Sequence, residues 1–474
     1  MANSYLSKTP SASNRRTMTF SVWVKRSRLG YGQPIFTANT DISVDASGHF
    51  SFDGDDTLHF RSWHNPGYQL LTSTNRKFQD TTSWYHIVVA MDTTQATDTN
   101  RVKFYVNGVQ ETSLQHTSYP AQNYEGFWNS NILHNVGRGN DGGIQYHEGN
   151  MAHFHFVDGT ALTPSTFGET DSTTGEWKPK LNPTGITYGT NGFFLKFEDP
   201  SSLGTDSSGN SNTWTVNGDL KQSVNTPSNV FCTLDTNQAY APAQVHYGGT
   251  AYLGTSASAD GCASTQMVKN GKWYFEVKLG TDRTTTDSAT ISIAKNGTHA
   301  QRRWRYAGGA NAIVGKETGS NGCEGITYQP LTSTPNIIDD GGGGTVNYGT
   351  QASENDIIMV AVDLSNATTG KIWFGKNGTW FNAPATSNAG VPNTGANAGL
   401  SFAKGDDFWG INITSASNQA NNANKYMYCN FGEGRFGATA VASGNADDNS
   451  VGTFEYDVPA GFYAICTKNI KSYG

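Results

Sequence analysis

The chain has 474 residues, more than one hydrophobic core usually serves, and this length suits two domains of ordinary size. Charged residues make up only 15% of it, whereas 54 glycines and a 12% aromatic content are typical of short strands joined by many turns. The net charge of -7 and the scattered basic residues argue against a nucleic-acid partner, because phosphate binding needs clustered cations. Because no apolar leader and no run of about 18 apolar residues is present, we expect synthesis in a host cytoplasm and no membrane insertion.

Strand-like patterns dominate the amino-terminal half. Residues 17–24 and 84–91 are short runs rich in β-branched and aromatic side chains, and residues 102–106 are a third. The third run ends at Asn107-Gly108, a dipeptide that favours a hairpin because both turn residues adopt positive φ. The best helical candidate in the whole chain is the short turn that begins at Thr163.

The carboxyl-terminal half repeats this pattern. Strands are predicted at residues 272–279, 290–294, 356–364, 371–374 and 461–466. Further Asn-Gly turns begin at Asn217, Asn270, Asn296 and Asn377. A polar, proline-containing stretch at residues 225–229 is the expected boundary. The sequence therefore predicts an all-β protein of two tandem antiparallel β-sandwich, jelly-roll-like domains, residues 1–228 and 229–474.

The five cysteines give no sign of a disulfide framework or a zinc site. They are odd in number and lack Cys-x-x-Cys spacing. We expect them to be buried as small apolar residues. They are Cys232, Cys262, Cys323, Cys429 and Cys466.

Five motifs in order make the first domain resemble the laminin G-like, concanavalin A-like jelly-roll family. They are residues 20–25 (FSVWVK), 84–89 (WYHIVV), 102–108 (VKFYVNG), 136–138 (VGR), and 149–154 (GNMAHF) with its continuation to Pro164. The second domain resembles the SPRY family, which is also a β-sandwich. Its matching segments are residues 271–277 (GKWYFEV), 355–363 (NDIIMVAVD), 371–380 (KIWFGKNGTW), 430–432 (NFG) and 458–462 (VPAGF).

This pairing of domains is similar to bacteriophage virion proteins, especially those of marine and cyanobacterial phages. The resemblance implies a structural protein located in the virion, as a tail fibre, a tail appendage or a capsid-surface protein. It implies other virion proteins and host-surface glycan as partners, and a homo-oligomer, with a trimer preferred among closed symmetries.

Catalytic patterns are missing from the sequence. Glycosidases on concanavalin-like sandwiches use paired carboxylates, which the family carries as Glu-x-Asp-x-x-Glu, and no such run occurs here. The adjacent Glu198 and Asp199 would point to opposite faces of a strand. A Gly-x-Ser-x-Gly elbow is absent too. We therefore expect no enzymatic activity and no required cofactor.

Two groups of residues are candidate metal ligands. His153 and His155 share one face of a predicted strand with His147 nearby, either as ligands or, in the favoured interpretation, as the polar outer face of that strand. Asp53, Asp55 and Asp141 could hold calcium, as some laminin G-like domains do, or could simply form turns.

Sugar recognition uses exposed aromatic rings for stacking, with loop polar groups for the hydroxyls. Aromatic residues in polar surroundings give these candidates: Arg61, Trp63, His64, Tyr68, Trp128, Arg303 and Trp304. Each could instead fill a core or contact a protein. The leading hypothesis is a non-catalytic virion protein that presents lectin-like domains. The alternatives are a purely structural capsid decoration protein without a ligand, and a polysaccharide-degrading hydrolase.

Overall fold

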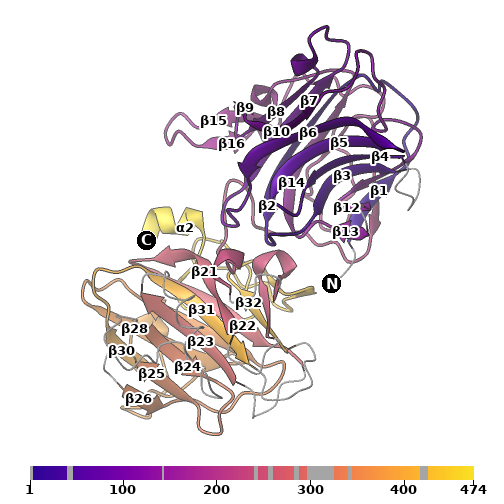
Figure 1. Cartoon of the computed structure of the whole chain (residues 1–474). Coiled ribbons are helices and arrows are strands. Elements are labelled where there is room, and N and C mark those ends of the chain that lie inside the picture. The colour runs from indigo at the N-terminus through magenta and orange to yellow at the C-terminus, as the bar shows by residue number, and fades with distance from the viewer. Residues whose placement is uncertain are drawn as a thin grey trace. The chain divides into compact units, whose positions relative to one another are not determined.

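The computed structural model describes residues 4–39, 46–140, 143–239, 244–254, 260–281, 288–295, 325–339, 344–416 and 425–474. The chain divides into two compact units, Met1–Gln222 and Ser223–Gly474 (Figure 1). Each unit stacks two large antiparallel sheets, which confirms the all-β, two-sandwich fold class. Within the described ranges, no helix is long and apolar enough to cross a membrane.

The polar segment expected to separate the domains belongs to the second unit. The Ser223 hydroxyl and the Asn225 amide donate hydrogen bonds to the Glu433 carboxylate at 3.4 and 3.0 Å. Thr226 and Asn229 pair with each other as an isolated bridge. The second unit thus begins a few residues before the expected position, because Glu433, distant in sequence, holds the segment.

The first unit contains a sheet of eight strands and a sheet of six. The eight strands are β1 (Tyr5–Lys8), β3 (Gln33–Asn39), β4 (Ala46–Phe52), β5 (Thr57–His64), β6 (Gly67–Lys77), β10 (Leu114–Ser118), β11 (Leu133–Val136) and β18 (Thr215–Asn217). They lie in the order β10-β6-β5-β4-β3-β11-β1-β18. The six are β2 (Thr17–Arg26), β7 (Tyr85–Asp92), β8 (Val102–Val106), β9 (Val109–Glu111), β14 (Gly149–Asp158) and β17 (Phe193–Leu195). Their order is β17-β14-β2-β7-β8-β9.

Short elements complete this unit. Two hairpins pair β12 (Arg138–Asn140) with β13 (Ile144–Tyr146) and β15 (Gly168–Thr170) with β16 (Trp177–Pro179). Two 3-10 turns are η1 (Asp98–Asn100) and η2 (Pro164–Thr166), and η2 is the helical turn that the sequence predicted at Thr163.

Aromatic side chains from both sheets form the core between them. The Phe20 ring of β2 lies 5.2 Å from Phe36 of β3 and 5.8 Å from Phe50 of β4, measured between ring centroids. Burying each such ring contributes roughly 1.5–3 kcal/mol. Since strand side chains alternate, Val88 of β7 points away from this core and packs with Phe167 and other rings on the outer face. Both faces of β7 are covered, which explains the unbroken apolar run at residues 84–91.

The second unit has a sheet of nine strands and a sheet of six. The nine are β19 (Val245–His246), β20 (Ala251–Gly254), β22 (Lys272–Leu279), β27 (Ile357–Asp363), β28 (Thr369–Lys376), β29 (Thr379–Trp380), β30 (Leu400–Ala403), β32 (Lys425–Asn430) and β35 (Tyr463–Ala464). The six are β21 (Asp260–Val268), β23 (Ser288–Lys295), β24 (Gly325–Gln329), β25 (Asn336–Asp339), β26 (Gly344–Asn347) and β31 (Trp409–Ala416). They run in the order β21-β31-β23-β24-β25-β26.

Smaller elements of this unit are the pair β33 (Arg435–Phe436) and β34 (Thr439–Ala440), the 3-10 turns η3 (Thr236–Gln238), η5 (Tyr247–Gly249) and η6 (Pro392–Thr394), and the helix α2 (Thr467–Tyr473). β35 joins β22 in parallel, whereas the other strand ladders are antiparallel. The seven-residue helix α2 was not predicted; it begins shortly after β35, with Ile465 and Cys466 between them.

The strand β22 shows how the nine-stranded sheet is covered on both sides. Trp273, Phe275 and Val277 point into the core between the two sheets. Tyr274 points to the opposite face, where it packs with Phe454 and Phe462 of the carboxyl-terminal segment. That segment therefore completes the unit by covering a face that would otherwise expose apolar side chains.

Only some of the Asn-Gly dipeptides are hairpins. Those at Asn107 and Asn377 join β8 to β9 and β28 to β29 with positive φ at both turn residues. Asn217 ends β18, which pairs with β1 and starts no hairpin. Asn270 lies between β21 and β22, which belong to different sheets. The prediction of an Asn-Gly hairpin is therefore confirmed at Asn107 and Asn377 and is wrong at Asn217 and Asn270, because long-range strand pairing decides what each segment connects. Asn296 lies outside the described residues.

Candidate functional site: an aromatic hairpin tip in the first unit

The hairpin between β5 and β6 ends in exposed aromatic side chains. Trp63 and Tyr68 are register partners across it, and their rings meet edge to face with centroids 4.8 Å apart. Tyr68 is 45% exposed, a large value for an aromatic ring, and Trp63 is half-buried. Cross-strand partners point to the same face of a sheet, so these two rings present one surface to solvent.

The other face of the tip holds a second aromatic pair. His64 is exposed and its ring lies 6.2 Å from that of Phe127, which is half-buried. Phe127 belongs to the loop at residues 119–132, between β10 and β11. Nearby, the Tyr124 hydroxyl hydrogen-bonds to the Ser62 hydroxyl at 2.8 Å, which joins this loop to β5. We call Trp63, His64, Tyr68 and Phe127 the aromatic tip.

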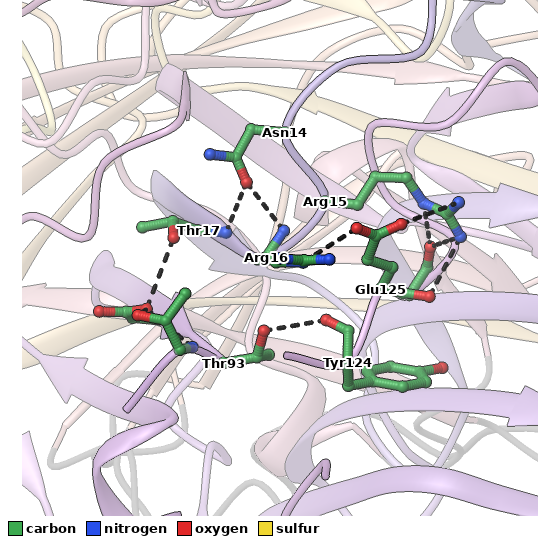
Figure 2. Close-up of polar contacts among 10 residues, drawn as sticks. Asn14, Arg15, Arg16, Thr17, Thr93, Tyr124 and Glu125 are labelled. Atoms are coloured by element: carbon green, nitrogen blue, oxygen red, sulfur yellow. Dashed lines mark hydrogen bonds and ion pairs between the residues drawn. The ribbon is translucent and has the colours of Figure 1, made fainter. Parts of the chain in front are cut away.

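Two arginines hold the loop against the sandwich. Figure 2 shows the side chains of Arg15 and Arg16 converging on Glu125. Arg15 Nε donates to the Gly126 carbonyl at 2.7 Å, and Arg16 Nε donates to Glu125 Oε1 at 2.9 Å. The Thr93 hydroxyl donates to the Tyr124 carbonyl at 2.9 Å from the opposite side. Charge-assisted bonds of this kind fix backbone positions, so Phe127 is presented from an ordered loop.

Arg61 shares the outer face of the sheet with the Trp63–Tyr68 pair but is not a free cation. Its side chain is buried, and its guanidinium lies 3.4 Å from the Asp53 carboxylate. The same carboxylate lies 3.6 Å from His59 Nδ1. Burial lowers the pKa of His59, and the Arg61 charge lowers it further against the opposing pull of Asp53. Arg61 was predicted to contact a ligand directly; it is instead part of a polar cluster within the sheet.

Trp128 is not a ligand-binding residue. It is fully buried, and its indole stacks on Phe60 with centroids 4.1 Å apart and planes 7° apart. A side chain at Gly48 would collide with the ring, so β4 passes directly against it. The prediction was wrong because Trp128 immediately follows the exposed part of its loop, where sequence cannot show which ring turns inward.

The carboxylates of the acidic turn at residues 53–56 already have protein partners for their hydrogen bonds and ion pairs. Asp55 accepts hydrogen bonds from the Thr57 amide and hydroxyl at 3.0 and 2.6 Å, and these bonds lower its pKa against the effect of burial. Asp56 pairs with the buried Arg26 at 2.9 Å. Among the described residues no group of three His, Cys, Asp or Glu side chains could hold a metal ion. Asp141 lies outside the described residues, so a calcium role for it stays a prediction.

The three histidines near β14 do not form a polar outer face. His155 is buried, stacks on Phe194 at 3.7 Å and hydrogen-bonds through Nδ1 to the Tyr188 hydroxyl at 2.7 Å. Burial lowers the pKa of His147 to about 3. His153 sits at a bulge with φ of 46°. The covering layer that contains Tyr188 and Phe194 converts the expected outer face into an interior one.

Some of the remaining predicted positions lie outside the described residues. Arg303, Trp304 and Cys323 lie outside the described residues. The other four cysteines are buried free thiols, which confirms their interpretation. Sequence reasoning missed a pocket in the second unit, lined by Trp380 and Tyr456 among others. The only local sign of this pocket in the sequence was Trp380, shortly after the Asn377-Gly378 turn, and an aromatic residue there is equally typical of a strand.

Residues 2–166 match the family described as the concanavalin A-like lectin/glucanases superfamily. The matched segment lies inside the first unit and confirms the laminin G-like resemblance of that unit, which has a concanavalin A-like sandwich fold. It spans less than half of the chain. A search of curated proteins found no match.

Several solved structures are weakly similar. Domains LG4-5 of the mouse laminin alpha1 chain match at 10% identity over 90% of this chain and 84% of that one, with a TM-score of 0.28. A putative carbohydrate binding protein from Bacteroides ovatus matches at 16% identity over 46% and 57%, with a TM-score of 0.29. The SPRY domain of human HERC1 matches at 12% identity over 41% and 96%, with a TM-score of 0.26. Likenesses this weak assign neither ligand nor activity to the chain.

Proposed function

We propose that the chain is a non-catalytic glycan-binding protein and that the Trp63–Tyr68 face of the aromatic tip in its first unit is the binding surface. The observation that carries the proposal is the Trp63–Tyr68 pair at the end of the hairpin, in which Tyr68 is exposed and Trp63 is half-buried. In an edge-to-face pair, one aromatic ring can stack on the apolar face of a sugar ring while the other ring supports it from the side. The family match of the first unit to lectins and glucanases supports the same ligand class.

Polar groups suited to sugar hydroxyls surround the rings. His64, Asn65 and Gln69 are exposed on the same hairpin. Each can donate or accept a hydrogen bond, as recognition of hydroxyl groups requires. A surface of this kind suits a segment of a polysaccharide chain better than a small buried ligand.

A glycan array with the full chain tests this function. We expect retention of a defined class of polysaccharide or oligosaccharide by the wild type, and its loss in the double variant Trp63→Ala, Tyr68→Ala. The double variant Ile144→Ala, Leu181→Ala removes exposed apolar side chains elsewhere in the unit and serves as the matched control. Release of reducing ends from any bound glycan would contradict the non-catalytic assignment and favour a hydrolase.

The finer assignment is a bacteriophage virion protein that uses this surface for host adsorption. It rests on the resemblance of the paired domains to virion proteins, with other virion proteins as partners and a homo-oligomer as the assembly. Antibody labelling of purified virions tests it. Label on a tail or fibre with blocked adsorption supports the adsorption role, whereas label on the capsid with normal adsorption favours a decoration protein and absence of label rejects the virion assignment.

A further inference from the structure

The second unit contains a pocket of 470 Å³ that is unrelated to the aromatic tip. Pockets of roughly 300–1,000 Å³ are large enough to hold a small ligand or a side chain with its flanking backbone. Two half-buried aromatic residues, Trp380 and Tyr456, line it together with polar side chains. The polar members are Asn393, Ser443, Asn445, Glu455 and Asp457.

A buried carboxylate fixes the part of the pocket wall that Glu455 and Tyr456 form. Glu276 of β22 accepts hydrogen bonds from the backbone amides of Glu455 and Tyr456 at 3.0 and 2.9 Å. It also accepts from the Tyr274 hydroxyl at 3.0 Å and the Asn430 amide at 3.1 Å. A buried carboxylate with four donors is strongly constrained, so two successive residues of the wall are preorganised.

The aromatic walls are held equally firmly. The Tyr456 ring lies so close to Gly378 that a side chain there would stand 3.1 Å from it. Trp380 meets Tyr274 edge to face with centroids 6.3 Å apart. Asn445 donates to the Glu455 carbonyl at 2.9 Å, which ties the neighbouring loop to the same wall.

The pocket is acidic and contains no compensating cation. Its lining includes Glu455 and Asp457 but no Lys, Arg or His. Burial raises the pKa of Tyr456, and the nearby charges of Glu455, Glu276 and Asp356 raise it further. Asp457 is exposed, and within the described part of the chain it pairs with no basic group. A cationic ligand would relieve this accumulation of negative charge.

We infer that this pocket binds an arginine side chain of a basic segment on a partner protein. The guanidinium is planar, stacks on aromatic faces and binds carboxylates through a fork of donors, so it fits a site made of Trp380, Tyr456, Glu455 and Asp457. A lysine would gain the charge attraction but not the planar stacking. The site would give the protein a second partner, independent of glycan binding by the first unit.

The test measures binding of three short peptides to the full chain, identical except for a central arginine, lysine or citrulline. Citrulline keeps the shape of arginine and lacks its charge. We expect the arginine peptide to bind most tightly and the citrulline peptide to bind at least about tenfold more weakly. The difference in affinity between these two peptides should shrink at high salt.

Variants locate the site. Asp457→Asn changes an exposed side chain. It should weaken binding of the arginine peptide about fivefold to tenfold without disturbing folding. Trp380→Ala should weaken binding of the arginine peptide to a similar extent. Trp380→Phe keeps an aromatic face and should bind that peptide nearly as tightly as the wild type. Glu198→Gln removes an exposed charge in the first unit and Phe408→Ala an exposed ring elsewhere in the second, so both should bind as the wild type does.

The inference is overturned if the arginine and citrulline peptides bind equally, or if Asp457→Asn and Trp380→Ala bind the arginine peptide as tightly as the wild type. It is also overturned if a neutral oligosaccharide, rather than the peptide, is lost on Asp457→Asn. The two peptide outcomes do not bear on the aromatic tip, because Trp63 and Tyr68 are unchanged in every variant, whereas loss of the oligosaccharide would also contradict the glycan site in the first unit.

Discussion

Trp128 anchors the core of the first unit at the scale of single residues. It is among the largest fully buried side chains of the chain and stacks on Phe60. We expect Trp128→Ala to lower the free energy of unfolding of the first unit by about 3–5 kcal/mol, because the cavity cannot collapse between two sheets. Urea denaturation followed by circular dichroism measures this. A loss well under about 1 kcal/mol would show that the ring is not the core residue described here.

Buried histidines make the first unit sensitive to acid. Burial lowers the pKa of His86 to about 3 and that of His134 to about 4. An unfolded histidine has a pKa of about 6.5, so below that pH the unfolded chain binds more protons and stability falls as pH falls. The stabilisation that each neutral, buried histidine gives the folded state is fully present above about pH 6.5. It is lost progressively as the pH falls toward the folded-state pKa, at up to about 1.4 kcal/mol per pH unit for each histidine.

Unfolding free energies at about pH 7, 6 and 5 check this expectation. His134 accepts a hydrogen bond from the Asn129 amide at 3.0 Å, and a glutamine could replace part of that bonding without titrating. His134→Gln should therefore flatten the pH dependence of the first unit. Equal unfolding free energies at pH 7 and 5 in the wild type would contradict the buried, neutral state of these histidines.

At the scale of elements, the arginine clamp on the loop at residues 119–132 links the fold to the proposed site. Arg15→Ala removes hydrogen bonds to the carbonyls of Glu125 and Gly126. We expect faster amide hydrogen exchange across the loop and weaker glycan binding, since the loop supports the hairpin through the Tyr124–Ser62 hydrogen bond. Arg76→Ala is the matched control, because Arg76 pairs with Glu111. Unchanged exchange and affinity in Arg15→Ala would mean that the loop is held by other contacts.

Strands whose two faces are both buried were largely predictable from the sequence. Residues 272–279 coincide with β22 because most side chains in that strand are buried, which gives a run of aromatic and aliphatic residues that only Glu276 and Lys278 interrupt. The helix α2 was missed because its sequence, TKNIKSY, has almost no apolar periodicity. Of the site, Trp63 and Tyr68 could be predicted because they are aromatic residues in a turn-rich stretch. The burial of Trp128 and Arg61 could not, because it depends on strands β4 and β5 and on Asp53.

At the scale of the whole molecule, each unit has its own core between its own two sheets. A fragment of residues 1–222 should therefore fold by itself with a cooperative transition and keep the glycan affinity of the full chain. Circular dichroism melting and binding measurements on the fragment test this. A fragment that is unfolded, or folded without glycan affinity, would contradict the independence of the first unit and its assignment as the glycan-binding part.

The most direct test of the central claim is calorimetric titration of the full chain with the glycan that the array identifies. Loss of one stacked aromatic ring should weaken binding by roughly 1–2 kcal/mol, which is about a fivefold to thirtyfold rise in Kd. We predict this loss for Tyr68→Ala and for Trp63→Ala, with Leu181→Ala binding as the wild type. Equal affinities for all four proteins would contradict the aromatic tip as the glycan site.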